Sequence, residues 1–251
     1  MKKKEKRKKR KPHLAKKVAK AYDGSTDQLK GWCPVRLVIP PMELARRMVR
    51  TAIGMAVFAF GNYLTVLAGV GQAPWNVLCD GLSQHLPWSY GTATMLVSFA
   101  ILAADLALGE PIWLATLMDA AMIGPLFDVF NAMGLVSKPA HAWLGLALMT
   151  AGMTLLAVGQ RIYMPAQFSC GPRAALTVGL GKRLRKLPVG AVEILIQVGA
   201  CFAGWLLGGS VGVGTLWFAF GNGIVMQTVF RVTRFEPRDM RHLGIHQLLA
   251  R

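Results

Sequence analysis

Six long apolar stretches constrain this chain more than any other feature of its sequence. They cover residues 51–70, 91–108, 112–135, 141–160, 188–208 and 211–231. Each has roughly the ~20 residues that a helix needs to cross a hydrocarbon layer about 30 Å thick. A segment in lipid must satisfy its own backbone hydrogen bonds, so each stretch is predicted to be a helix. The sequence therefore predicts an all-α integral membrane protein with about six transmembrane helices.

The charged residues lie mainly outside these stretches. The chain is 53% hydrophobic and 16% charged, with a net charge of +17, whereas soluble domains carry about 25% charged residues. Residues 1–31 hold thirteen Lys or Arg and three acids, which predicts a disordered polybasic tail. Residues 32–50 are expected to form an interfacial segment, and residues 233–251 a basic C-terminal segment. Since Lys and Arg accumulate on the cytoplasmic side, both termini are predicted to be cytoplasmic.

The same charges indicate the partners of the chain. Basic tails beside a membrane bind anionic lipid headgroups, so a membrane accounts for the charge and no nucleic-acid partner is expected. The sequence is also compatible with homo-oligomers.

No pattern of an enzyme is present. The sequence lacks the HExxH and Walker motifs, and its four cysteines form no CxxC pair. We therefore expect no catalytic residues, no metal site and no cofactor.

An internal repeat divides the membrane region into two halves, residues 51–135 and 141–232. The run from Gly61, GNYLTVLAGVGQAPWNVLCDGL, aligns with the run from Gly159, GQRIYMPAQFSCGPRAALTVGL, at an offset of 98 residues. Farther on, at an offset of 99, Thr116-Leu117 meets Thr215-Leu216. Small residues, Pro and Thr recur in the same order in both halves, which favours a duplication over chance agreement.

Each half contains one short segment opened by a proline, at about 74–88 and 172–186. Both segments are too short and too polar to span comfortably, and Pro is favoured just inside a helix start. We expect half-helices that enter the membrane without crossing it, which is tolerated where protein or water covers them. Each half then has three spans and the repeats are inverted, a recurrent transporter design. The alternative is eight spans in parallel repeats, if both short segments cross.

Three acids inside the predicted spans are functional candidates, because a charge at the centre of a membrane helix costs about 2.5–3.5 kcal/mol on insertion scales. Asp119 and Asp128 lie in one span, nine residues apart, on opposite faces of a straight helix. Glu193 lies near the start of another span, with Arg173 or Arg183 as a simple partner. For all three, a proton or cation role competes with a structural one.

Three motifs resemble the YczE-like group of the YitT/YczE membrane proteins. They are APWNVL at 73–78, GPRAAL at 171–176 and GGSVGVGT at 208–215. The resemblance covers about residues 50–232 and implies a bacterial inner-membrane protein, without an established substrate. Asn76 stands where that family usually has Asp, and Ala174 replaces a second Asp, so the resemblance implies no role for those acids here.

Together these features predict a multi-pass inner-membrane protein that is a small transporter or permease for an unknown small molecule or ion. The alternative is a membrane accessory or scaffold protein that transports nothing and binds a partner or anionic lipid. The candidates for the pathway come from the acids, the repeat and the three motifs. They are Pro74, Trp75, Asn76, Asp80, Thr116, Asp119, Asp128, Pro172, Arg173, Glu193, Gly212, Gly214 and Thr215.

Overall fold

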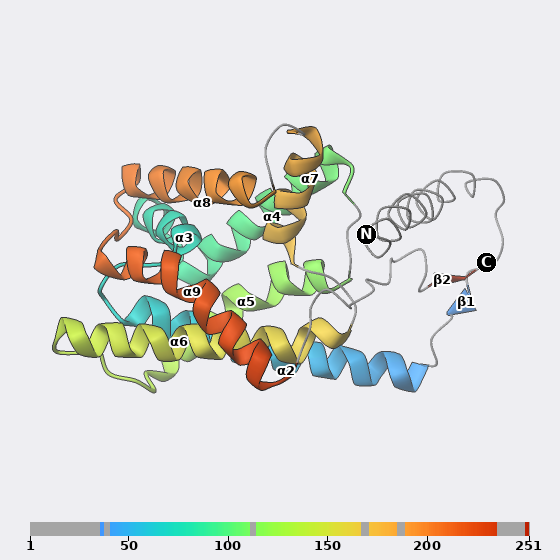
Figure 1. Ribbon diagram of the computed structural model, residues 1–251, viewed down its shortest axis with the longest axis horizontal. Coiled ribbons are helices and arrows are strands. Elements are labelled where there is room, and N and C mark those ends of the chain that lie inside the picture. The colour runs from blue at the N-terminus through green and yellow to red at the C-terminus, as the bar shows by residue number, and fades with distance from the viewer. Residues whose placement is uncertain are drawn as a thin grey trace, which may run out of the picture. The chain divides into compact units, whose positions relative to one another are not determined.

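Apolar helices make up almost all of the structure, a computed structural model that describes residues 36–37, 41–110, 114–166, 171–184, 189–234 and 249–250. The helices are α2 (Pro41–Leu67), α3 (Pro74–His85), α4 (Tyr90–Leu108), α5 (Leu114–Met133), α6 (Ala142–Tyr163), α7 (Pro172–Arg183), α8 (Val189–Leu206) and α9 (Val213–Val232). The minor elements are a 3-10 turn η2 (Met164–Ala166) and two strands of two residues, β1 (Arg36–Leu37) and β2 (Leu249–Ala250). The predicted tail 1–31 lies outside the described residues, as does nearly all of 233–251. The helices belong to one unit, residues 37–249 (Figure 1).

Four described helices are long and apolar enough to cross a membrane: α2 from Ala45, α4, α6 and α9. The apolar part of α8, Gly190–Leu206, is shorter. Helix α5 is 20 residues long and contains Asp119, Asp128 and Pro125, which lower its hydropathy. Of the six predicted spans, four therefore meet this criterion in the described chain.

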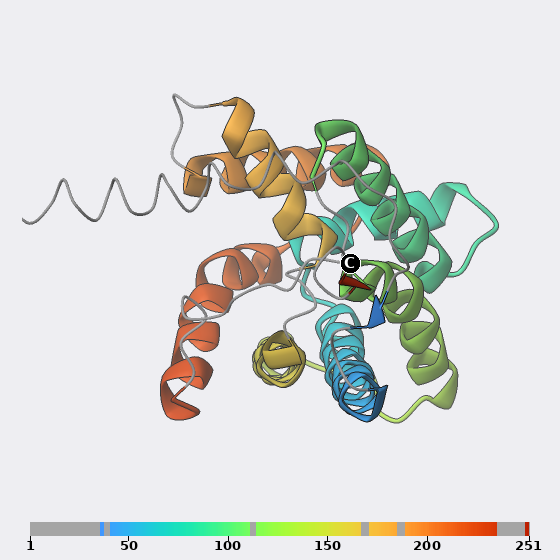
Figure 2. The ribbon, with the colours of Figure 1, turned by 90° about the vertical axis from the view of Figure 1, so that its right-hand side faces the viewer.

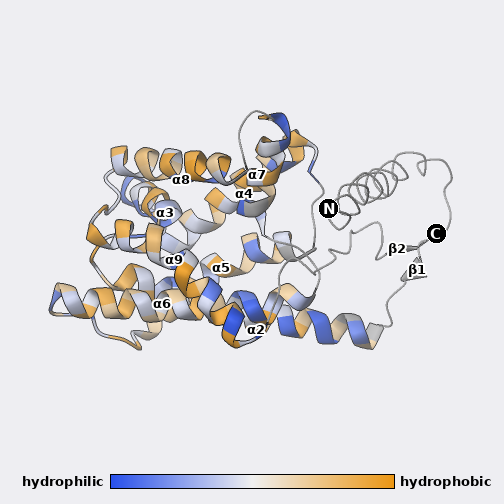
Figure 3. Cartoon of the chain, in the orientation of Figure 1, coloured by the Kyte–Doolittle hydropathy of each residue, from blue (hydrophilic) through white to orange (hydrophobic). Residues whose placement is uncertain are grey.

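The outer faces of the last two helices are apolar. Phe220 is 77% exposed, Val213 69% and Leu206 66%. Side chains of this kind along whole helices make a larger apolar patch than a water-soluble monomer exposes. Figure 3 shows hydrophobic residues along α8 and α9, and hydrophilic ones gathered at the N-terminal end of α2. This distribution fits helices that face lipid.

The predicted interfacial helix within 32–50 and the first predicted span are one continuous helix, α2, which runs without interruption from Pro41 to Leu67. Proline is well suited to a first helical turn, and an ion pair four residues apart, Arg47 Nε to Glu43 Oε1 at 2.9 Å, supports the part that precedes the apolar run. Nothing between them breaks the helix.

The two predicted short helices are present. Helices α3 and α7 each have 12 residues and begin at a proline. They end at His85 and Arg183, about three residues before the predicted ends. Neither has a side-chain cap at its N-terminus, which leaves backbone N–H groups of the first turn available as donors.

The first helix of each half packs closely against the other. A Cβ added to Gly54 would lie 3.0 Å from the Gly159 carbonyl oxygen, and one added to Gly61 would lie 2.8 Å from that of Gly152. Early residues of α2 therefore meet late residues of α6, so the two helices are antiparallel. Small residues allow such a close approach. Figure 2, which looks nearly along the two helices, shows them side by side.

Two of the remaining contacts join the two halves, because α3 packs on α8 and α7 packs on α4. Others lie within one half, namely α4 on α5, α5 on α2 and α9 on α6. The α3–α8 contact is another close one, since a Cβ on Gly81 would lie 2.6 Å from the Gly204 carbonyl oxygen. The short helices are thus held by long helices from the opposite half of the sequence.

Candidate functional site

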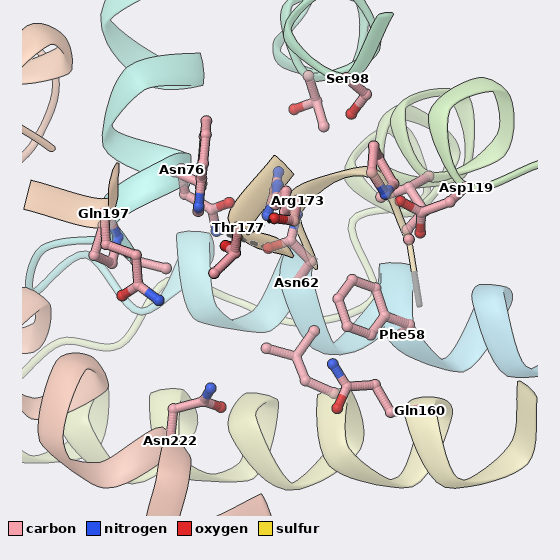
Figure 4. A pocket seen from close by; sticks show the side chains of 18 of the residues that line it. Phe58, Asn62, Asn76, Ser98, Asp119, Gln160, Arg173, Thr177, Gln197 and Asn222 are labelled. Atoms are coloured by element: carbon pink, nitrogen blue, oxygen red, sulfur yellow. Dashed lines mark hydrogen bonds between the residues drawn. The ribbon is translucent and has the colours of Figure 1, made fainter. Parts of the chain in front are cut away.

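A cavity of about 420 Å³ lies where the two short helices begin. Each of the eight described helices contributes at least one residue to its lining. Pro74 and Pro172, the first residues of α3 and α7, are both part of its wall. Figure 4 shows Arg173 near the middle of the group, Asp119 on one side, and Gln197 and Asn222 on the other.

Seven of the thirteen candidate residues line this cavity. They are Pro74, Trp75, Asn76, Asp119, Pro172, Arg173 and Glu193. They come from α3, α5, α7 and α8, segments up to about 120 residues apart in the chain, and the fold brings them together.

Arg173 is the cation of the cavity. Its guanidinium carbon lies over the indole ring of Trp75, 5.4 Å from the ring centroid. Trp75 is the second residue of α3 and Arg173 the second residue of α7, so the contact joins the starts of the two short helices. A guanidinium over an aromatic face is attracted by the ring quadrupole, which holds it in position without using its hydrogen-bond donors.

Asp119 is an acid of the same cavity, from the second turn of α5. It faces the start of α7, because a Cβ on Gly171 would lie 3.6 Å from Asp119 Oδ2. Gly171 has φ +77°, a conformation that glycine adopts readily. The turn into α7 therefore brings that helix start against the carboxylate.

Glu193 also lines the cavity, but its partner differs from the expected one. It accepts a hydrogen bond from Gln197 Nε2 at 3.2 Å, one turn along α8. Neither proposed arginine pairs with it in the described chain: Arg173 lies on Trp75, and Arg183 donates to the Ala107 carbonyl oxygen at 3.4 Å.

Neutral polar side chains form much of the remaining wall, and apart from Asn76 sequence reasoning missed them. Asn76 Nδ2 donates to Asn62 Oδ1 at 2.7 Å, and both residues are buried. Further polar groups in the lining are Thr94, Ser98, Gln160, Thr177, Gln197 and Asn222. One signal was available, because Asn62 and Gln160 are matched in the predicted repeat at its offset of 98 residues. Two carboxamides at matched positions of apolar helices indicate a shared polar site.

The other six candidates lie outside the cavity. Asp128 caps helix α4, since it accepts a hydrogen bond from the Gly91 N–H at 2.9 Å and another from Ser89 Oγ. A carboxylate at a helix N-terminus satisfies free donors and interacts favourably with the helix dipole. Asp128 therefore has a structural contact of the kind that the sequence left open as the alternative to a proton or cation role.

Asp80 connects α3 to the loop before α9, because its Oδ2 accepts from the Ser210 N–H at 2.8 Å. Thr116, at 1% exposure, is buried in α5. Neither lines the cavity.

The last three candidates, Gly212, Gly214 and Thr215, form a docking site for the α2–α3 loop. The Gly214 N–H donates to the Val70 carbonyl oxygen at 2.7 Å. Thr215 Oγ1 accepts from the Gln72 N–H and the Gly212 N–H, each at 3.2 Å. A side chain on Gly212 would meet the Val70 carbonyl oxygen at 2.5 Å. The glycine-rich motif thus fastens the first half of the chain to the start of α9.

This loop separates the central cavity from a second one of about 710 Å³. Ala73 lines the first cavity and Gln72 lines the second. Gln72 is 5% exposed, and its Oε1 atom is buried without a hydrogen-bond partner. Lys138 and His141 also line the second cavity. In the described chain, no three His, Cys, Asp or Glu side chains are grouped as metal ligands would be.

Comparison with known proteins agrees with the membrane character of the chain. An uncharacterised protein of Haemophilus influenzae is 28% identical over 73% of this chain and 83% of its own length. The uncharacterised membrane protein YczE of Bacillus subtilis is 25% identical over 74% of this chain and 86% of its own. The uncharacterised protein YyaS of the same organism is 28% identical over 76% and 92%. No solved structure matches the chain.

The family of unknown function DUF6198 matches residues 45–231, which include all the described helices from the second turn of α2 to the last turn of α9. The resemblance to YczE-like proteins is therefore confirmed, and this chain is a membrane protein that belongs to the DUF6198 family.

Proposed function

We propose that this protein is a small permease of the inner membrane, with six spans in two inverted repeats and its substrate site in the central cavity. The observation that carries the proposal is the cavity itself. A cavity that contains Arg173, Asp119 and several neutral polar side chains lies among apolar helices, at the meeting point of two helix starts. Ionisable groups inside a membrane domain mark substrate or ion pathways, and broken helices at the interface between repeats are a transporter design.

The close pair α2–α6 supports the inverted arrangement. At the repeat offset of 98 residues, Gly54 corresponds to Gly152 and Gly61 to Gly159. The contacts cross this correspondence, since Gly54 meets Gly159 and Gly61 meets Gly152. Equivalent helices related by a two-fold axis in the membrane plane would make such antiparallel contacts. Parallel repeats would place α2 and α6 in the same direction.

Several other helix pairs follow the same rule, although the α4–α5 contact has no counterpart of comparable extent between α8 and α9 in the described chain. If α3 corresponds to α7 and α4 to α8, then the contact α3–α8 and the contact α7–α4 are the same interface formed twice. The pairs α2–α5 and α6–α9 correspond in the same way. On this proposal α5 and α8 also cross the membrane, which brings the four apolar helices described above to six spans.

Polar contacts at the two ends of the helices support the orientation. At one end Arg50 Nε donates to the Ile162 carbonyl oxygen at 2.9 Å, and Lys182 pairs with Glu110 at 2.7 Å. At the other end the loop at Val70 meets Gly214, and the only nearby cation among the residues lining the second cavity is Lys138. The basic end would be cytoplasmic by the positive-inside rule, with both termini on that side.

Cysteine labelling tests the topology. In a cysteine-free background, Val136→Cys and Lys186→Cys are labelled in intact cells with a reagent that does not cross the membrane. We expect labelling at position 136 and protection at position 186. Protection at both positions would support eight spans in parallel halves, and the half-helix pathway would be abandoned.

The sequence of the tail favours a second candidate function, an accessory protein that transports nothing. Thirteen basic residues in 1–31 suit an acidic partner or anionic lipid. Complementation of a deletion strain of the source organism with variants of this protein distinguishes the two functions. A permease should require Asp119 and tolerate the loss of residues 1–31, whereas an accessory protein should require the tail and tolerate Asp119→Asn.

A further inference from the structure

Two opposite charges of the central cavity are not paired with each other. Within the described ranges, no hydrogen bond or ion pair within 4.0 Å engages the Asp119 carboxylate or the Arg173 guanidinium. They lie close enough to interact electrostatically, and both line the same cavity of about 420 Å³. The guanidinium rests on the Trp75 ring, which keeps it on its own side of the space.

Both side chains are half-buried in the cavity, and charges partly withdrawn from water gain from a counter-charge and hydrogen bonds. The acid lies at the start of α7 beside Gly171, while the guanidinium lies on the Trp75 ring of α3. The two charges therefore present one acceptor group and one donor group to whatever occupies the space between them.

The surroundings of Arg173 reinforce its preference for an anion. Helices α3 and α7 both begin at the cavity, and neither has a side-chain cap. The first N–H groups of a helix are free donors at the positive end of the helix dipole. Two such ends beside a guanidinium favour a carboxylate or another oxyanion. They supplement the guanidinium and would not make a site without it.

Asp119 sets the opposite requirement. A purely anionic ligand would leave this carboxylate without a counter-charge, and a purely cationic ligand would do the same to Arg173. A molecule that carries both charges compensates both groups at once. The carboxamides of the wall, such as Gln160 and Asn222, can hydrogen-bond the rest of it without favouring either sign.

We infer that the central cavity binds a small zwitterion of the amino-acid type, with its carboxylate on Arg173 and its ammonium group on Asp119. This inference rests on the proposed substrate site and adds the class of substrate. A cavity of this size also fits, since pockets for small molecules start at about 300 Å³.

Ligand-induced stabilisation of the purified full-length protein in detergent tests it. The probes are glycine, β-alanine, 4-aminobutyrate and 5-aminopentanoate, in which the distance between the two charges increases. Each has singly charged controls of equal chain length, the carboxylates acetate to pentanoate and the corresponding alkylamines. Ligand that binds only the folded state raises the melting temperature. We expect at least one zwitterion at 10 mM to raise it by about 2 °C or more, at the charge separation that fits, and the controls to have no effect.

Variants assign the effect to the two groups. Asp119→Asn and Arg173→Gln should each abolish the shift, measured against the melting temperature of the same variant without ligand. Asp128→Asn should retain it, because that acid caps α4 outside the cavity. If a removed charge prevents folding, Asp119→Glu and Arg173→Lys keep the charges and should change which chain length stabilises most.

Three results would overturn the inference. A carboxylate that stabilises the protein as well as the zwitterion, and still does so in Asp119→Asn, would make this an anion site. An amine that still stabilises Arg173→Gln would make it a cation site. An unchanged melting temperature with all four zwitterions would also refute the inference. Flux in proteoliposomes separates the inference from the proposed function: zwitterion binding without flux contradicts the permease, whereas flux of a simple anion contradicts only the zwitterion.

Discussion

The substitution Gly61→Ala tests the close contact between α2 and α6. The added Cβ would lie 2.8 Å from both the Gly152 carbonyl oxygen and the Leu156 backbone nitrogen, where ordinary contacts begin at 3.4 Å. Both neighbours are backbone atoms, so no side-chain rotation removes the clash and the helices have to separate by about 0.6 Å along that direction. Overpacking of this kind costs about 1–3 kcal/mol.

The matched control is Gly199→Ala in α8, where an added Cβ meets nothing within 4 Å. There the change should be neutral or gain up to about 1 kcal/mol, because alanine has the higher helix propensity. The gain in helix propensity is common to both variants, so they differ by the cost of overpacking alone. At about 2–4 °C for each kcal/mol in a chain of this size, Gly61→Ala should melt about 2–12 °C below the control. Tryptophan fluorescence of the detergent-purified proteins during heating measures both. Equal melting temperatures for the two variants would refute the claim that backbone contact at Gly61 holds α2 against α6.

Two further substitutions address the residues that lie outside the cavity. Thr215→Val removes the acceptor of two backbone N–H groups and should cost about 1–3 kcal/mol, whereas Thr228→Val, whose hydroxyl only donates within α9, should cost less; comparable melting temperatures would contradict the docking role of Thr215. Asp128→Ala removes the acceptor of the Gly91 N–H but leaves Ser89 Oγ on the Thr92 N–H, so it should cost about 0.5–2 kcal/mol, with faster amide hydrogen exchange at Gly91 in the first turn of α4. Unchanged exchange there would show that the cap contributes nothing.

The sequence was informative where local chemistry determines structure. The two prolines predicted where α3 and α7 begin, since proline suits the first turn of a helix, and long apolar runs predicted the membrane helices. The predicted ends at 88 and 186 lie about three residues beyond the ends of the helices at His85 and Arg183, because no residue type in these segments marks a helix end as proline marks the start. The apolar run alone predicts a span from residue 51, and the charged residues ahead of it continue the same helix back to Pro41.

The composition of the cavity depended on packing, which one sequence reveals only in part. Asp119 and Asp128 were equally exceptional as acids in an apolar segment, yet one faces the cavity and the other caps a neighbouring helix. Only the packing of α4 against α5 decides between these roles. The glycines at 212 and 214 attracted attention as a motif, but their function in the fold is to let the loop at Val70 approach. That contact joins segments more than 140 residues apart.

The glycine contact between α2 and α6 also limits how this protein can move. Where backbone touches backbone, there is no layer of side chains that could slide or change rotamer to let one helix shift along the other. Helices α2 and α6 should therefore move together as one rigid unit. A movement of α3 with α8, or of α4 with α7, would then leave the α2–α6 pair unchanged.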